Sequence, residues 1–163
     1  MGSSAGGNIA YHAGLRAAVE LDHQGPLKIR GLILIQPFLG GVERSASELR
    51  LVNDPILPHG VTDLMWDLSL PKGANRDHEY CNPTVGNGSK QLDEIGRLGW
   101  RVMVTGCGGD PLVDRQKELV KLLEHKAMQV VDHFVEGECH GIQDTEPLKA
   151  KPLFVVFKNF MSS

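Results

Sequence analysis

The chain has 163 residues, with 17 Lys and Arg against 20 Asp and Glu, so its formal net charge is −3 at pH 7. This balance is not typical of a basic nucleic-acid-binding protein, and we expect no nucleic-acid partner. Hydrophobic residues make up 41% and charged residues 23%, which excludes disorder as the main state. No run approaches the roughly 18 apolar residues of a membrane span and the first residues do not resemble a secretion signal, so we expect a cytoplasmic protein that does not bind membranes.

The predicted elements alternate between helix and strand along the chain. Small and apolar residues at helical spacing predict a helix over residues 8–21, and a continuous apolar run predicts a strand over residues 29–38 that is buried on both faces. A second strand is expected over residues 100–106, a helix over 114–126, a third strand over 127–135 and a closing helix over 148–161. This alternation predicts an α/β fold with a mostly parallel sheet and helices on both of its faces.

The segment from about residue 40 to residue 93 has a different texture. Prolines separate short helical pieces over residues 47–52 and 61–70, which is typical of an inserted, lid-like segment. In the second piece Leu64 and Leu68 are spaced i and i+4 beside Trp66, and together they could cover an apolar substrate pocket. The alternative is core packing, which we favour for most of these side chains and least for Trp66.

The first residues contain a nucleophile motif. Gly2-Ser3-Ser4-Ala5-Gly6 fits the pattern Gly-x-Ser-x-Gly, in which small neighbours allow a sharp turn from strand to helix that exposes the serine hydroxyl. Ser4 would be the nucleophile, and the backbone N–H of Ala5 would point at a developing oxyanion from the start of the helix. The alternative is that this Gly- and Ser-rich stretch is merely a frayed terminus.

An acid and a histidine follow the two later strands. Asp110 comes directly after the strand over residues 100–106, where open parallel sheets place their sites, although it could equally be a turn residue or helix cap. Asp114 is a competing acid, but a capping role at the start of the next helix explains it sufficiently. His140 follows the third strand, so the chain order is Ser, Asp and then His, as expected of a hydrolase triad on a parallel α/β sheet.

These motifs together resemble those of a known family. The segments concerned are Gly2-Ser3-Ser4-Ala5-Gly6-Gly7-Asn8, Gln36-Pro37-Phe38, Asp77-His78-Glu79-Tyr80-Cys81-Asn82-Pro83, Asp110-Pro111-Leu112-Val113-Asp114 and His140-Gly141. The sequence resembles plant carboxylesterases of the hormone-sensitive-lipase-like α/β-hydrolase family over nearly its whole length. The resemblance implies hydrolysis of a small carboxylic ester by a catalytic triad with Ser4 as nucleophile, His140 as base and Asp110 as acid.

The sequence also departs from that family. Members carry a His-Gly-Gly motif well upstream of the nucleophile, whose N–H groups build most of the oxyanion hole, and this sequence has no such motif. Residues 1–163 therefore resemble the C-terminal half of an α/β-hydrolase domain, without the strand that leads into the nucleophile turn. We expect impaired catalysis, and self-association through the sheet edge that this leaves exposed.

A non-catalytic protein is the alternative to an esterase. It would be a truncated paralogue, or a small-molecule receptor similar to the gibberellin receptors, which share the fold but have lost the catalytic histidine. The presence of His140 weighs against the receptor.

Neither a metal nor an organic cofactor is expected. The cysteines, Cys81, Cys107 and Cys139, are odd in number and widely spaced, which favours reduced thiols that serve as packing residues. A zinc site that combines them with histidines would match no common spacing of ligands.

Overall fold

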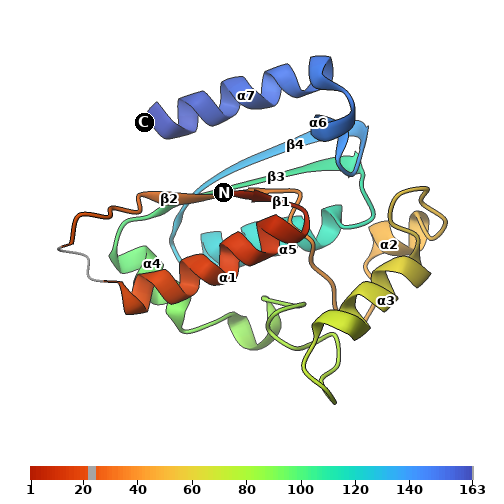
Figure 1. The fold of residues 1–163 in the computed structure, drawn as a ribbon, viewed down its shortest axis with the longest axis horizontal. Coiled ribbons are helices and arrows are strands. Elements are labelled where there is room, and N and C mark those ends of the chain that lie inside the picture. Colours follow the sequence, from red (N-terminus) through yellow and green to blue (C-terminus); the bar gives the residue numbers. More distant parts are fainter. Residues whose placement is uncertain (22–24, 163) are drawn as a thin grey trace.

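A parallel sheet forms the centre of the molecule. The computed structural model describes residues 1–21 and 25–162. Its strands are β1 (Gly2–Ser3), β2 (Gly31–Ile35), β3 (Arg101–Gly109) and β4 (Gln129–Cys139), which lie side by side in the order β1-β2-β3-β4 (Figure 1). Every neighbouring pair is parallel, with Ile33 of β2 opposite Met103 of β3 and Met103 opposite Val131 of β4. The parallel α/β architecture expected from the sequence is confirmed.

Helices cover both faces of this sheet. Helices α1 (Ala5–Glu20), α4 (Gln91–Arg97) and α5 (Val113–His125) lie on one face, and α7 (Pro147–Ser162) lies on the other (Figure 1). On the first face, Leu34 of β2 packs with Leu15 of α1 and Leu119 of α5 in the larger apolar core. On the second face, Ile33 of β2 packs with Phe157 of α7. Because alternate residues of β2 face opposite cores, the strand is apolar throughout, as its sequence predicts.

The strand before Ser4 corrects one expectation. We expected it to be absent, yet β1 pairs Gly2 with Leu34 and Ser3 with Ile35. Two residues suffice because Gly2 lies against the first turn of α1, where a Cβ atom would collide with the backbone oxygen of Gly6. The start of the chain is therefore anchored in the sheet rather than frayed.

The segment between β2 and α4 extends beyond the sheet. It contains α2 (Ala46–Arg50), α3 (His59–Ser69) and the short 3-10 helix η1 (Val85–Asn87), and Figure 1 shows α2 and α3 beyond the end of the sheet. Trp66 is buried and stacks on Phe38 with ring centroids 5.0 Å apart, whereas Leu64 and Leu68 are 58% and 78% exposed. The expectation of core packing is therefore wrong for Leu64 and Leu68 and correct for Trp66. The lid-like character of residues 40–93 remains a prediction.

The remaining helix, α6 (Ile142–Thr145), is a single turn that links β4 to α7. In the part of the chain that the structure describes, no helix has the length and apolar character needed to cross a membrane.

Candidate active site

The turn between β1 and α1 holds Ser4 in a strained conformation. Its φ of 53° and ψ of −119° lie outside the regions that non-glycine residues favour. The turn is fixed by backbone hydrogen bonds from Ser4 N to Ile35 O and from Phe38 N to Ser4 O, both 2.9 Å. Strain at a serine between a strand and a helix is the signature of a nucleophile turn, because it lifts the side chain above the end of the sheet.

Three side chains that the sequence singled out lie in one hydrogen-bonded chain. His140 Nε2 is 2.8 Å from Ser4 Oγ, and His140 Nδ1 is 2.8 Å from Asp110 Oδ2. Asp110 is fully buried and His140 is 5% exposed, whereas Ser4 is only half-buried. Ser4 follows β1, Asp110 follows β3 and His140 follows β4, so the parallel sheet brings together residues that are far apart in the sequence.

The carboxylate of Asp110 is held from several sides. Its Oδ1 accepts a hydrogen bond of 2.9 Å from the backbone N–H of Leu112, and its Oδ2 accepts one of 3.0 Å from Gln116 Nε2. The bond to Leu112 is that of a turn residue, and Oδ2 is at the same time the oxygen that faces His140. These bonds fix the carboxylate toward the imidazole and supply the partners that a buried charge needs.

Asp114 has a role that the sequence did not predict. Instead of capping its own helix, its Oδ2 accepts a hydrogen bond of 2.7 Å from the backbone N–H of Ser47 in α2. The competing acid therefore links the α2 segment to α5.

The other predicted site residues are placed differently. Ala5 is the first residue of α1, and an N–H in the first turn of a helix has no intrahelical acceptor, so it is free to bind an anion. Leu64 and Leu68 lie at the surface of α3, while Trp66 points into the core. A pocket lined by all three is not what the structure shows, and a substrate contact of the two leucines stays a prediction.

Sequence reasoning named Gln36 only as part of a family-like segment, without a role, and missed Gln116; both are buried beside the site. A polar residue at the end of an otherwise apolar strand was the available signal for Gln36, because this is where parallel sheets place functional groups. For Gln116 the signal was weaker, since a glutamine in the first turns of a helix is common.

Cys81 and Cys107 are free and buried, and burial raises the pKa of each thiol to about 12. They are therefore protonated at neutral pH. Within residues 1–21 and 25–162 no group of three or more His, Cys, Asp or Glu side chains could hold a metal ion.

Comparison with known proteins gives consistent results. A family described as alpha/beta hydrolase fold matches residues 1–144. Carboxylesterase 20 of Arabidopsis thaliana is 55% identical over 163 residues, covering 100% of this chain and 50% of the relative. The 3-O-acetylpapaveroxine carboxylesterase CXE2 of Papaver somniferum is 45% identical, covering 99% of this chain and 51% of the relative. The chain thus spans about half the length of these curated relatives.

Two further proteins are similar to this chain, one in sequence and one in structure. Gibberellin receptor GID1 of Oryza sativa subsp. japonica is 38% identical over 116 residues, which is 71% of this chain and 30% of the receptor. The crystal structure of a thermostable esterase from Pseudomonas putida ECU1011 superposes with a TM-score of 0.73 at 22% identity, covering 93% of this chain and 44% of the esterase. The chain therefore belongs to the α/β-hydrolase family and is similar, within that family, to plant carboxylesterases.

Proposed function

We propose that this chain carries the nucleophile, base and acid of a serine carboxylesterase that hydrolyses small carboxylic esters. The observation that carries the proposal is the continuous hydrogen-bonded chain from Ser4 through His140 to Asp110, with both links at 2.8 Å. A side-chain hydroxyl, an imidazole and a buried carboxylate in this order are the groups that acyl transfer to serine requires.

The geometry supports a two-step reaction. Asp110 accepts a hydrogen bond from the Nδ1–H of His140, which leaves the Nε2 lone pair of His140 facing the Ser4 hydroxyl. Nε2 takes the hydroxyl proton as Oγ bonds to the ester carbonyl carbon, and the imidazolium then gives that proton to the departing alcohol. In the second step His140 takes a proton from water, the water oxygen attacks the acyl-serine, and Ser4 recovers its proton as the acid leaves.

The oxyanion of each tetrahedral intermediate would face the N–H of Ala5. Members of the family that this sequence resembles add N–H donors from a His-Gly-Gly motif, which this sequence does not contain. Because losing one oxyanion donor costs a factor of about 10²–10³ in rate, we propose that this chain by itself is impaired. We propose no cofactor, since the steps above use only protons and the serine.

The poppy relative guides the choice of substrate. Its name specifies an acetylated compound. An ester with a short acyl group is therefore our first choice for an assay. Separately, we propose a cytoplasmic location for the reaction.

Labelling with a fluorophosphonate probe tests the proposal, because the probe reacts only with an activated serine. We expect labelling of the unmodified chain and of Ser3→Ala, and none of Ser4→Ala. Ser3 is a matched control, since it is the adjacent serine and its hydroxyl accepts a hydrogen bond from Gln143. Equal labelling of Ser4→Ala, or no labelling of a chain that circular dichroism shows to be folded, would contradict the proposal.

A non-catalytic, receptor-like protein is the second candidate. The similarity to a gibberellin receptor favours it. The hydrogen bond between His140 and Ser4 argues against it, because a receptor has no use for an activated serine. Absence of labelling in the folded chain is the result that would favour the receptor.

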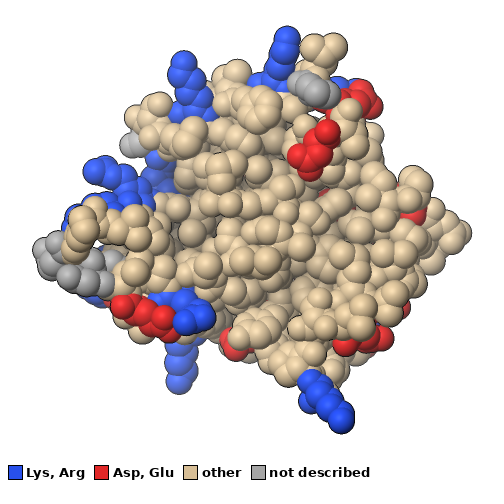
Figure 2. Space-filling model, viewed as in Figure 1, with Lys and Arg blue, Asp and Glu red and all other residues tan. Residues whose placement is uncertain are grey.

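We also propose that the chain self-associates through the β1 side of its sheet. Strand β1 covers only Leu34 and Ile35 of β2, and a cavity of about 690 Å³ lined in part by Met1, Gly31 and Ile33 lies beside this edge. Figure 2 shows few charged side chains over the middle of the face that carries β1 and α1. We expect sedimentation to depend on concentration, whereas a monomer with a cooperative melt at all concentrations would exclude this proposal.

A further inference from the structure

Gln36 has an unusual backbone conformation for its position. It follows the last residue of β2, it is 3% exposed, and its φ is 43° although it is not a glycine. It also precedes Pro37, and a residue before proline favours extended backbone. A strained residue that persists next to a site is a reason to look for a function.

The side-chain amide of Gln36 reaches the two residues that flank His140. Its Oε1 accepts a hydrogen bond of 2.8 Å from the backbone N–H of Gly141, and its Nε2 donates one of 3.2 Å to the carbonyl of Cys139. The other proton of Nε2 is directed to Cys107 Sγ at 2.7 Å. One side chain thus binds the backbone before and after the imidazole.

Cys107 completes this arrangement. Its Sγ donates a hydrogen bond of 3.1 Å to the same carbonyl of Cys139. Burial raises the pKa of this thiol to about 12, so at neutral pH it keeps the proton that it donates. The carbonyl of Cys139 therefore has two donors, Cys107 on the neighbouring strand β3 and Gln36 at the end of β2, one strand further along the sheet.

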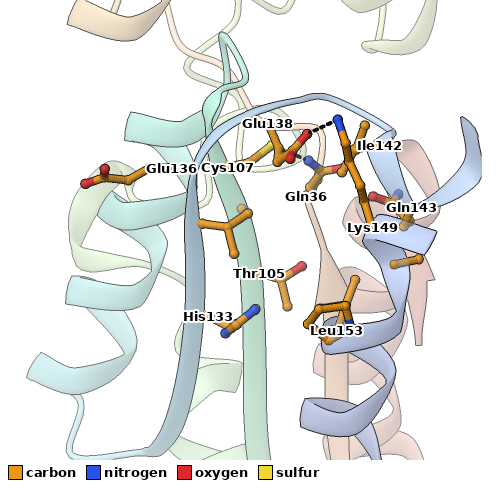
Figure 3. A pocket seen from close by; sticks show the side chains of 14 residues that line it. Gln36, Thr105, Cys107, His133, Glu136, Glu138, Ile142, Gln143, Lys149 and Leu153 are labelled. Carbon is orange, nitrogen blue, oxygen red and sulfur yellow. Dashed lines mark hydrogen bonds and ion pairs between the residues drawn. The ribbon is translucent and has the colours of Figure 1, made fainter. Parts of the chain in front are cut away.

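The segment around His140 lies at the end of the sheet, next to a cavity. Figure 3 shows Gln36 and Cys107 together at the end of the strands, beside a cavity of about 300 Å³ between the sheet and α7. The last pair of the ladder between β3 and β4 joins Gly109 to Cys139, so His140 follows the end of sheet pairing. Gly141 then turns the chain with a φ of 74°. Because Glu138 and Ile142 on either side of this segment line the cavity, hydrogen bonds contribute to fixing its position.

We infer that Gln36 is a positioning residue, which fixes the backbone on both sides of His140 and thereby holds the imidazole between Asp110 and Ser4. This inference deepens the proposed function and rests on it for its catalytic meaning. The hydrogen bonds of the Gln36 side chain go to Cys107, Cys139 and Gly141, so in this inference it acts through His140. Its effect is therefore expected in the tautomer and orientation of the imidazole.

NMR measurement of the His140 ring nitrogens tests the inference without needing hydrolysis. The full chain should show a single tautomer with the proton on Nδ1, and His140→Ala assigns the signals. Gln36→Met has similar length but no hydrogen bonds, and we expect it to give a mixture of tautomers. Gln36→Glu keeps the acceptor for Gly141 and loses the donors, so we expect a smaller change. Gln143→Met is the matched control, and it should leave the His140 signals unchanged.

Fluorophosphonate labelling gives the second readout. We expect Gln36→Met to be labelled at least tenfold more slowly than the unmodified chain at each pH, and Gln143→Met to be labelled at the normal rate. Wild-type tautomer and rate in both Gln36 variants would overturn the inference, and so would a mixture of tautomers in the unmodified chain. If neither Gln36 variant folds, the role of Gln36 is structural and the inference is also wrong. Failure of the proposed function gives a different result from failure of this inference. If the proposed function is wrong, the unmodified chain is not labelled, but the His140 NMR signals still change in the Gln36 variants.

Discussion

The carboxyl ends of the strands and the α2–α3 segment beyond them are built in different ways. At the strand ends, the buried side chains of Asp110 and His140 are fixed by short hydrogen bonds to groups on neighbouring elements. The α2–α3 segment is attached through ion pairs of Glu48 and through the stacking of Trp66 on Phe38, and it leaves Leu64 exposed. The comparison indicates that hydrogen bonds to neighbouring elements fix the side chains at the strand ends, whereas the α2–α3 segment presents exposed apolar side chains at the surface.

The largest effect is expected from Asp110→Asn, which changes one atom at the strand ends. We expect kcat to fall by about 10⁴, because an amide at this position favours the wrong imidazole tautomer. Thermal unfolding should change little, since the bond from Leu112 can persist. Asp114→Asn is the matched control, because it alters a nearby carboxylate that contacts Ser47 instead of the imidazole. Equal losses in the two variants would remove the distinction between the regions.

Glu48→Gln tests how the second region is attached. Glu48 is 4% exposed and forms ion pairs with Arg44 and Arg115. Arg44 and Arg115 keep Asp63 and Glu118 as other partners, so we expect a loss of about 1.5–3 kcal/mol in the free energy of unfolding, the size of one charged hydrogen bond. Urea unfolding measures it, and Glu20→Gln, in an exposed pair with Arg16, should show no measurable loss.

The same residue predicts a response to acid. Burial by itself would raise the pKa of Glu48, but hydrogen bonds from Ser45 and Arg44 and the charge of Arg115 outweigh it and lower the pKa. Because the folded pKa is below the unfolded one, the stabilisation is complete above the unfolded value and is lost as pH falls through the folded value. Melting temperatures measured on acidification should fall more steeply for the unmodified chain than for Glu48→Gln. Parallel curves would contradict this.

The pH dependence of hydrolysis tests the role of His140 at the strand ends. Only neutral imidazole can accept the Ser4 proton, so activity should rise with pH in the acidic range. Initial rates with a short acyl ester across the acidic and neutral range measure this. In His140→Ala the residual rate should lose the rise, and an unchanged profile would show that another base operates.

The smallest effect is expected at the surface of α3. If Leu64 and Leu68 contact substrate, Leu64→Ser and Leu68→Ser should raise KM for longer acyl chains about three- to fivefold without changing kcat, since partial cover of a leucine contributes about 1 kcal/mol. Leu148→Ser, an exposed leucine of α7, is the control. A fall in kcat with unchanged KM would mean that α3 belongs to the catalytic region.

The same comparison explains what the sequence could predict. A parallel strand buried on both faces has an apolar run that few other structures share, so β2 and β3 were recognisable, and the residues that follow such strands are natural site candidates. The order of Ser4, Asp110 and His140 along the chain then predicted a hydrolase triad. The contacts of Gln36 were not predicted, because they reach a loop that is 103 to 105 residues away in sequence.

Helix α3 shows where periodicity fails. Thr62 and Trp66 are spaced i and i+4 in the same way as Leu64 and Leu68, so the spacing alone does not say which pair faces the core. The structure buries Trp66 because Phe38 offers it a ring to stack on. That contact joins residues far apart in the sequence, and no local pattern reports it.

The distribution of the site along the chain has a consequence for folding kinetics. Asp110 and His140 are 30 residues apart within the contiguous β3-α5-β4 unit, whereas Ser4 and His140 are 136 residues apart. Because the entropy lost on loop closure grows with loop length, we expect the histidine and acid to meet early and the serine to dock late. A partly folded chain would then hold the histidine and the acid together but no activated hydroxyl, so nucleophilic reactivity appears only with the completed sheet.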